Sequence, residues 1–244
     1  MKVIKDIPYS KLKHQQQVLD LYLPDTDEFS VFIYFHGGGL EIGTKDWGKN
    51  LGEYLAQHNV AVISADYRMY PTAVYPDFIE DAAEVVAWAH KNLGDYGKCR
   101  KIFVGGSSAG AYLSMMLCFD KRYLAAYNID PAELGGFVHD AGQPTAHFNV
   151  LREKGIDSRR VIVDETAPLY YIGSEQSYAP MLFLVADKDM ENRYEQTMLV
   201  ASTLKHFRVD ESKYKVRVLE GTHCCYDKEK LEHIVYDFIK STDK

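Results

Sequence analysis

The chain has 244 residues, and its 28 lysines and arginines against 35 aspartates and glutamates give a formal net charge of −7. This length admits one large α/β domain or two small ones, and the 46% hydrophobic and 26% charged fractions exclude disorder and collagen-like repeats. The chain is acidic and has no cluster of basic residues, whereas phosphate binding needs a basic face, so no nucleic-acid partner is expected.

Strands and helices alternate along the first half of the chain. A half-buried strand is predicted over 17–23, and short runs rich in β-branched and aromatic residues predict buried strands at 31–35 and 60–65. Helices are expected at 47–57 and, most clearly, at 77–93, where apolar residues recur at helical spacing after an acidic first turn.

The same alternation continues to the C-terminus. A strand at 102–104 leads through a glycine-rich turn into a helix over 108–119, and a short strand is expected at 136–139. The last four elements predicted are a strand, a helix, a strand and a helix, at 181–186, 194–207, 214–219 and 228–240. This alternation is typical of βαβ units, so we expect an α/β fold with a mostly parallel twisted sheet and helices on both faces.

The sequence predicts no membrane span, leader peptide or metal site. The longest apolar runs, 31–35 and 181–186, are far shorter than the about 20 residues of a membrane helix. The charged N-terminus lacks an apolar signal core, which predicts a cytoplasmic protein without a membrane partner. The four cysteines have no metal-binding spacing and are expected to be reduced and unpaired: Cys99, Cys118, Cys224 and Cys225.

The segment Gly106-Ser107-Ser108-Ala109-Gly110 matches the pattern G-x-S-x-G and lies between a predicted strand and a predicted helix, as that motif requires. In such a sharp turn the two glycines let the backbones approach, and Ser108 projects over the sheet as a nucleophile. The amide of Ala109, at the helix N-terminus, can then stabilise an oxyanion. Taken alone, the pattern is equally compatible with a glycine-rich turn that binds phosphate.

A second glycine-rich segment, His36-Gly37-Gly38-Gly39, follows the strand predicted at 31–35. Three consecutive glycines are costly in conformational entropy, which is explained if backbone amides must face a ligand oxygen. We expect the amides of Gly38, Gly39 and Ala109 to form an oxyanion hole. His36 is expected to brace this loop rather than to act as an acid or base. The alternative is an ordinary flexible loop.

A nucleophilic serine needs a base, and that base needs an orienting carboxylate. In this architecture both follow late strands, in the order Ser, Asp, His. His223 is the only histidine that follows a late predicted strand, so we predict it as the base. The strand at 181–186 leads to two carboxylates. Asp189 has room to turn toward His223 and is favoured as the acid, with Asp187 as the alternative.

With these residues the chain resembles α/β-hydrolases of the hormone-sensitive-lipase-like esterase group, in particular small bacterial ferulic acid esterase-like and kynurenine formamidase-like enzymes. The resemblance is carried by the two glycine motifs, Asp66-Tyr67-Arg68, Asp189 and His223, and it covers about residues 18–240. It implies Ser108 as nucleophile, Asp189 as acid and His223 as base, with the oxyanion donors named above. It also implies that Asp66-Tyr67-Arg68 braces the glycine loop.

The chain departs from this group at two places. Leu40 follows the glycines where many relatives carry Trp, which alters the expected pocket wall. Only about 30 residues precede the glycine loop, so no large N-terminal cap is expected, and any lid must come from 123–177. Six residues of that segment are candidate wall residues, although ordinary loop roles are favoured for each: His139, Asp140, Gln143, His147, Tyr170 and Tyr171.

The sequence thus predicts a single α/β-hydrolase domain over 1–244 that cleaves small carboxylic esters, with short-chain, aryl or carbohydrate-linked groups, through a Ser-His-Asp acyl-enzyme mechanism. No metal or organic cofactor is required, and the expected partner is a small-molecule ester. The alternatives are an arylformamidase or other amidase with the same triad, a non-catalytic binding module on the same fold, and a peptidase. The oligomeric state stays open, with a homodimer as one option.

Overall fold

The computed structural model describes residues 1–175 and 177–243; residues 176 and 244, which the predicted domain includes, lie outside the described part. Eight strands form, in chain order, at Lys2–Pro8 (β1), Val18–Leu23 (β2), Glu28–Phe35 (β3), Val60–Ala65 (β4), Lys98–Ser107 (β5), Gly136–Asp140 (β6), Met181–Lys188 (β7) and Tyr214–Thr222 (β8). The α-helices are Lys49–Gln57 (α1), Asp77–Asn92 (α2), Ala109–Phe119 (α3), Arg122–Ala125 (α4), Phe148–Glu153 (α5), Arg193–His206 (α6) and Lys228–Thr242 (α7).

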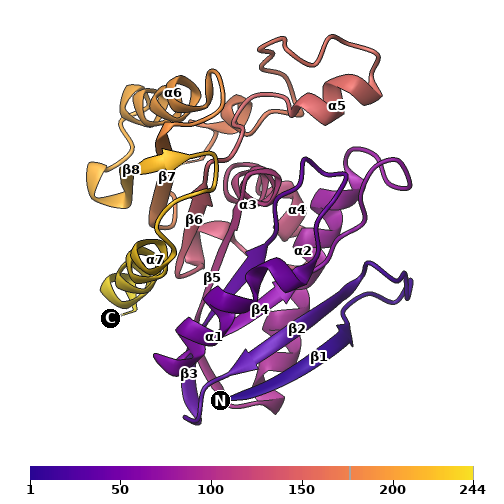
Figure 1. The fold of residues 1–244 in the computed structure, drawn as a ribbon, viewed down its shortest axis with the longest axis vertical. Helices are drawn as coiled ribbons and strands as arrows, with labels where there is room; N and C mark the ends of the chain where they lie inside the picture. Colours follow the sequence, from indigo (N-terminus) through magenta and orange to yellow (C-terminus); the bar gives the residue numbers. More distant parts are fainter. Residues whose placement is uncertain (176, 244) are drawn as a thin grey trace.

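The strands form one sheet in the order β1-β2-β4-β3-β5-β6-β7-β8, which runs through the centre of the molecule (Figure 1). β2 pairs antiparallel with both β1 and β4, and the strands from β4 to β8 in this order are parallel to one another. The parallel strands therefore end at one common edge of the sheet, where loops can bring distant residues together. The α/β fold predicted from the alternation of elements is confirmed.

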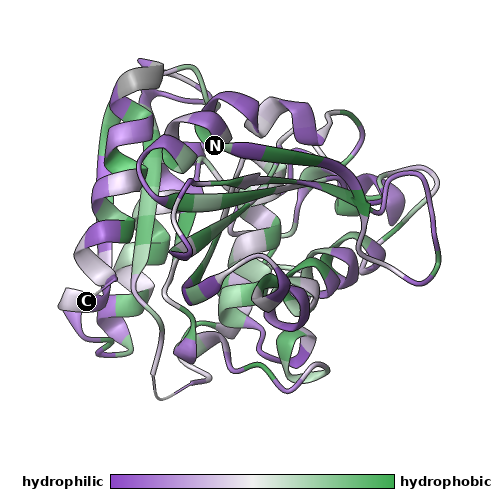
Figure 2. Cartoon of the chain, turned by 90° about the horizontal axis from the view of Figure 1, so that it is seen from below, coloured by the Kyte–Doolittle hydropathy of each residue, from purple (hydrophilic) through white to green (hydrophobic). Residues whose placement is uncertain are grey.

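Helices cover both faces of this sheet, because successive residues of each strand point to opposite sides. Ile33 and Phe35 of β3 belong to the core under α2, α3 and α6, whereas Phe32 belongs to the core under α1 and α7. Figure 2 shows the hydrophobic strands between helices that also carry hydrophilic residues. Each fully buried aliphatic or aromatic side chain of these two layers contributes about 1.5–3 kcal/mol to folding.

The structure contains every strand and helix that the sequence predicts, with ends that differ by a few residues. The prediction omitted β1, an edge strand whose residues are mostly exposed and show no apolar run. It also omitted the short helices α4 and α5. The four cysteines are free thiols, as their spacing predicted. Within the described residues, no helix has the length and apolar character needed to cross a membrane.

Candidate active site

Ser108 occupies the sharp turn between β5 and α3, since β5 ends at Ser107 and α3 begins at Ala109. Its backbone has φ 53° and ψ −111°, a conformation that residues other than glycine rarely adopt. The amide of Ser108 donates a hydrogen bond to the carbonyl oxygen of Asp140 at the end of β6, at 2.7 Å. The turn is thus fixed to the neighbouring strand, with the serine at the carboxyl edge of the sheet.

Two glycines make this turn sterically feasible. A Cβ atom on Gly110 would lie 2.0 Å from the carbonyl oxygen of Phe35 at the end of β3, and one on Gly106 would lie 2.5 Å from the carbonyl carbon of Gly110. Both contacts are with backbone atoms, which cannot move aside as a flexible side chain can. The first and last residues of the G-x-S-x-G pattern are therefore required by close packing, for the reason that the motif suggests.

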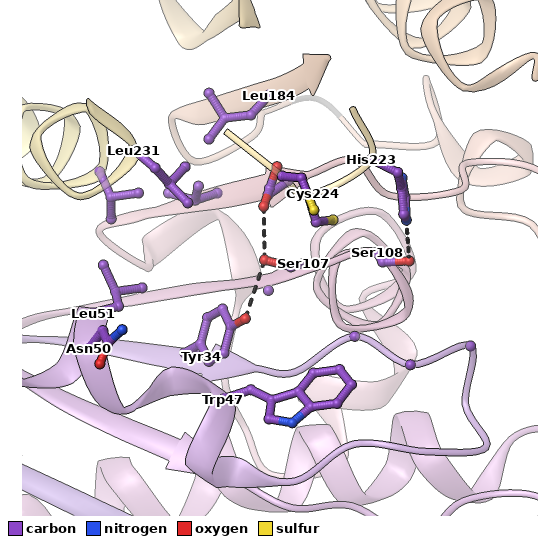
Figure 3. Close-up of a pocket in the computed structure, with 18 of the residues that line it drawn as sticks. Tyr34, Trp47, Asn50, Leu51, Ser107, Ser108, Leu184, His223, Cys224 and Leu231 are labelled. Atoms are coloured by element: carbon purple, nitrogen blue, oxygen red, sulfur yellow. Dashed lines mark hydrogen bonds between the residues drawn. The ribbon is translucent and has the colours of Figure 1, made fainter. Parts of the chain in front are cut away.

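Ser108, His223 and Asp189 form one continuous hydrogen-bonded row. The Nε2 atom of His223 lies 2.8 Å from Ser108 Oγ, as Figure 3 shows, and its Nδ1 atom lies 2.6 Å from Asp189 Oδ1. His223 follows β8 directly, and Asp189 follows β7 directly. The carboxylate of Asp189 also accepts hydrogen bonds from the amides of Ala186, at 3.1 Å, and Met190, at 2.8 Å. Three separate loops thus place these side chains in the order that acyl transfer requires.

The side chain of Asp189 is inaccessible to solvent. Burial would raise its pKa, but the hydrogen bonds from His223 and from two backbone amides outweigh that effect and hold the pKa of Asp189 below its ordinary value. Asp189 therefore stays ionised and can stabilise an imidazolium. Asp187 instead accepts a hydrogen bond from the amide of Gly221 at 2.9 Å, which ties β7 to β8. The geometry joins Asp189, and not Asp187, to the histidine.

The glycine loop, residues 36–39, faces Ser108 across the site. Gly38 and Gly39 have φ values of 104° and 67°, and a Cβ atom on Gly38 would lie 1.9 Å from the carbonyl oxygen of Ile42. Within the described part of the chain, the amides of Gly38, Gly39 and Ala109 donate to no protein acceptor. Three backbone donors close to the nucleophile are therefore free to bind an oxygen atom of a ligand.

Helix α5 supports the glycine loop from the opposite side. The Nδ2 atom of Asn149 donates to the carbonyl oxygen of Gly39 at 2.9 Å. The ring of Phe148 packs so closely that a Cβ atom on Gly39 would lie 2.9 Å from it. Neither residue was predicted from the sequence. No local pattern marks them, and their only signal is their place in the segment 123–177.

His36 contacts its own loop as predicted, and Asp66 lies beside its ring, with Oδ1 3.8 Å from Nε2 of His36. The hydroxyl of Tyr67 donates to the carbonyl oxygen of His36 at 2.9 Å, and the two rings are stacked. The Nδ1–H group of His36 donates to the carbonyl oxygen of Gly37, at 2.7 Å. Asp66 accepts a hydrogen bond from the amide of Lys45, at 2.6 Å. Burial lowers the pKa of His36 to about 4, so the ring is neutral at neutral pH.

Two expectations about this region need correction. Arg68 does not touch the glycine loop: its side chain forms a salt bridge with Asp81 of α2, with Nη2 2.7 Å from Oδ1. The tripeptide is linked to the loop by the hydroxyl of Tyr67, and the amide of Tyr70 donates to the carbonyl oxygen of Leu40, the residue after the loop, at 2.8 Å. Leu40 is fully buried in the hydrophobic core and does not line the cavity beside Ser108, whereas Trp47 does.

A cavity of about 640 Å³ opens beside Ser108 and His223. Its walls come from the glycine loop, α1, α7 and the ends of the central strands, and the described residues of the segment 123–177 contribute Val138, Asp140 and Phe148 alone. Asp140 is thus the one correct candidate among the six wall residues proposed from the sequence.

The other five candidates lie elsewhere. His139 is buried in the core, with Nδ1 2.8 Å from the hydroxyl of Ser114. Gln143 and His147 are also buried, and they bind groups of their own segment. Tyr170 and Tyr171 line a separate cleft. These side chains shape the segment around the site without reaching the cavity.

Comparison with known proteins places this architecture in a family. Residues 32–226 match a family model described as the alpha/beta hydrolase fold. A probable isoprenylcysteine alpha-carbonyl methylesterase of Arabidopsis thaliana is 34% identical over 111 residues, which cover 44% of this chain and 26% of the relative. The carboxylic ester hydrolase LipN of Mycobacterium tuberculosis is 34% identical over 104 residues, which cover 41% of this chain and 28% of LipN. The matches span about a quarter of the length of these curated relatives.

Solved structures extend the similarity over the whole chain. A truncated carbohydrate esterase from gut microbiota aligns with a TM-score of 0.81 at 18% identity, covering 100% of this chain and 96% of that one. An esterase of Thermogutta terrifontis with bound propionate aligns with a TM-score of 0.73 at 20% identity, covering 99% of this chain and 92% of that one. At these identities the likeness shows a common fold. Together with the family match over residues 32–226, it establishes that the chain belongs to the α/β-hydrolase fold family.

Proposed function

We propose that this protein is a serine esterase, which hydrolyses small carboxylic esters through an acyl-enzyme intermediate on Ser108. One observation carries the proposal: the hydrogen-bonded row from Asp189 through His223 to Ser108 lies beside three backbone amides that donate to no acceptor among the described residues. Nucleophile, base, orienting acid and oxyanion donors are the complete set of groups that acyl transfer needs.

The proposed mechanism assigns one proton path. His223 Nε2 takes the proton of Ser108 as the hydroxyl oxygen attacks the ester carbonyl. The amides of Gly38, Gly39 and Ala109 bind the oxyanion that forms. The imidazolium, held by Asp189, then protonates the leaving alcohol, and a water molecule activated by the same histidine releases the acid.

The substrate class follows from the cavity and from the relatives. Apolar side chains such as Phe32, Leu51 and Leu184 line much of the cavity, which favours short-chain or aryl groups over polyanions. The curated relatives are named as a methylesterase and a carboxylic ester hydrolase, and the solved structures are named as esterases. Since these names share the carboxylic ester bond, they support an ester as the substrate of this chain too.

Hydrolysis of p-nitrophenyl acetate and butyrate tests the proposal. The wild type should hydrolyse both esters, and Ser108→Ala should lower kcat by about 10³-fold or more. Absence of hydrolysis by the wild type, or full activity of Ser108→Ala, would overturn it. Rates on an ester and an anilide of the same acyl group distinguish an esterase from an amidase, and the esterase should favour the ester in kcat/KM.

The two neighbouring carboxylates provide a matched pair for the assignment of the acid. Asp189→Asn should lower kcat by about 10³–10⁴-fold, because the amide no longer holds the histidine in the required tautomer. Asp187→Asn should stay within a few-fold of the wild type, since Asp187 accepts a hydrogen bond from the amide of Gly221 in β8 rather than from His223. A larger loss at Asp187 than at Asp189 would reverse the assignment.

A further inference from the structure

A second row of hydrogen-bonded polar side chains lies beside the triad without being part of it, and Figure 3 shows Tyr34 and Ser107 of this row. The hydroxyl of Tyr34 donates to Ser107 Oγ at 3.3 Å, and Ser107 donates to Asp140 Oδ2 at 2.8 Å. The hydroxyl of Tyr226 donates to Asp140 Oδ1 at 2.9 Å. Tyr34, Ser107 and Asp140 all line the cavity, whereas Tyr226 reaches the carboxylate from outside it. We refer to these four residues as the Asp140 row.

Asp140 is a buried carboxylate with no salt bridge to a described lysine or arginine. It is 5% exposed, and none of the lysine and arginine side chains that the structure describes forms a salt bridge with it. Burial raises the pKa of Asp140 to about 6, although the hydrogen bonds from Ser107 and Tyr226 oppose that shift, so the group is ionised at neutral pH. A carboxylate can accept about four hydrogen bonds, and the protein supplies two. The Asp140 carboxylate can therefore accept further hydrogen bonds from a group in the cavity.

The space around the Asp140 row is otherwise mostly apolar. Figure 3 shows Leu51 and Leu231 on the side of the cavity away from His223, and Leu184 above them. We call this half of the cavity the inner chamber. Its apolar side chains come from three strands and from α1 and α7: Phe32, Leu51, Val138, Leu184, Leu231 and Val235. Besides Tyr34, Ser107 and Asp140, the polar side chains that line the cavity include Asn50, Cys224 and Glu232.

We propose that the inner chamber binds a hydroxyl-bearing group of the ester, and that Asp140 determines specificity by accepting a hydrogen bond from that hydroxyl. This inference rests on the proposed esterase function. A purely hydrocarbon group would displace water from the carboxylate without replacing its hydrogen bonds, which is costly for a buried charge. An anionic group would be repelled by Asp140. A group with an apolar body and a hydroxyl donor satisfies both the apolar walls and the polar row.

In the competing role, Asp140 only holds Ser107 and Tyr226 together, and Tyr226 belongs to the loop that follows β8 and begins with His223. Tyr226 separates the two roles, because it binds the same carboxylate without lining the cavity. Tyr226→Phe therefore weakens the brace but leaves the chamber side of Asp140 intact. Asp140→Asn keeps the shape of the side chain and removes its charge, and Asp140→Ala removes the acceptor.

The test measures kcat/KM for two matched series of esters. In the first series, p-nitrophenyl 3-phenylpropionate is compared with its ortho-, meta- and para-hydroxyphenyl counterparts, which places the hydroxyl on the acyl group. In the second, cyclohexyl acetate is compared with the hydroxycyclohexyl acetates, which places it on the alcohol. Each enzyme is judged by its ratio of hydroxylated to unsubstituted substrate. This ratio does not depend on how much of a variant is folded.

The wild type should prefer a hydroxylated ester by about tenfold or more in at least one series, and that series identifies the part of the ester in the inner chamber. Asp140→Asn should reduce the preference, Asp140→Ala should abolish it, and Tyr226→Phe should retain it. The inference is overturned by a wild type without preference in either series, by Asp140 variants that keep the preference, or by an equal loss in Tyr226→Phe. A wild type that hydrolyses none of these esters, nor p-nitrophenyl acetate, refutes the esterase function itself.

Discussion

Removing the charge of Asp140 should change how the stability of the protein depends on pH. Asp140 lies buried at the end of β6, and burial raises its pKa from 3.8 to about 6 in the folded protein. The unfolded chain ionises this carboxyl at the ordinary value, so between the two values the unfolded state binds fewer protons than the folded state. The wild type therefore loses stability from this group as the pH rises through that window. The Asp140→Asn variant has no carboxyl group to ionise at this position, so its stability does not fall for this reason.

The expected size of the effect follows from the shift. One pKa unit corresponds to about 1.4 kcal/mol, and the unfolded carboxyl is already partly ionised at pH 4, so the difference in unfolding free energy between Asp140→Asn and the wild type should grow by about 2 kcal/mol from pH 4 to pH 7. Any constant effect of the substitution on packing or hydrogen bonding cancels in this comparison. Asp189→Asn should show the opposite sign, and only below about pH 4, because the folded-state pKa of Asp189 lies below its ordinary value.

Urea unfolding at several pH values between 4 and 7 measures this difference for the wild type and both variants. The prediction requires the curve for Asp140→Asn to rise relative to the wild type between pH 4 and pH 7, and the curve for Asp189→Asn to stay nearly flat over that range. A free-energy difference for Asp140→Asn that is constant over the range would refute the reasoning. It would mean that Asp140 ionises as easily in the folded protein as in the unfolded chain.

Two further predictions concern the backbone around the nucleophile. Gly110→Ala should destabilise the protein by about 3 kcal/mol or more in urea unfolding, because its Cβ would lie 2.0 Å from a backbone oxygen. Gly94→Ala, with no atom within 4 Å of its Cβ, should change the unfolding free energy by less than about 0.5 kcal/mol. Equal losses in the two variants would contradict this prediction. Asn149→Ala removes the hydrogen bond to the carbonyl oxygen of Gly39, so kcat for p-nitrophenyl acetate should fall about tenfold with KM little changed. An unchanged kcat would show that α5 does not position the oxyanion amides.

The sequence predicted the sheet because buried parallel strands are continuous apolar runs, and both 60–65 and 181–186 stand out in this way. It did not predict β1, because an exposed edge strand needs no such run and depends on pairing with β2. Helix α5 has only six residues, too few to show a helical period. Local patterns thus identify elements that bury their own side chains, and they miss elements that tertiary contacts create.

The same distinction holds at the site. Ser108 and His223 could be predicted because each follows a strand of recognisable pattern, and position after a strand fixes the edge of the sheet at which a residue lies. The choice between Asp189 and Asp187 depends on how one loop turns, which no periodicity encodes. Asn149 acts on the glycine loop from 110 residues away in sequence, so only the folded chain reveals the contact.

The central claim is that Ser108 is the nucleophile that carries the acyl group. A p-nitrophenyl alkylphosphonate reacts with such a serine to leave a stable adduct, which peptide mass spectrometry can locate. We predict one adduct per chain on the peptide that contains Ser108, formed in proportion to the loss of ester hydrolysis and absent in Ser108→Ala. Loss of activity with the adduct on another residue, or persistent hydrolysis with Ser108 fully labelled, would contradict the account.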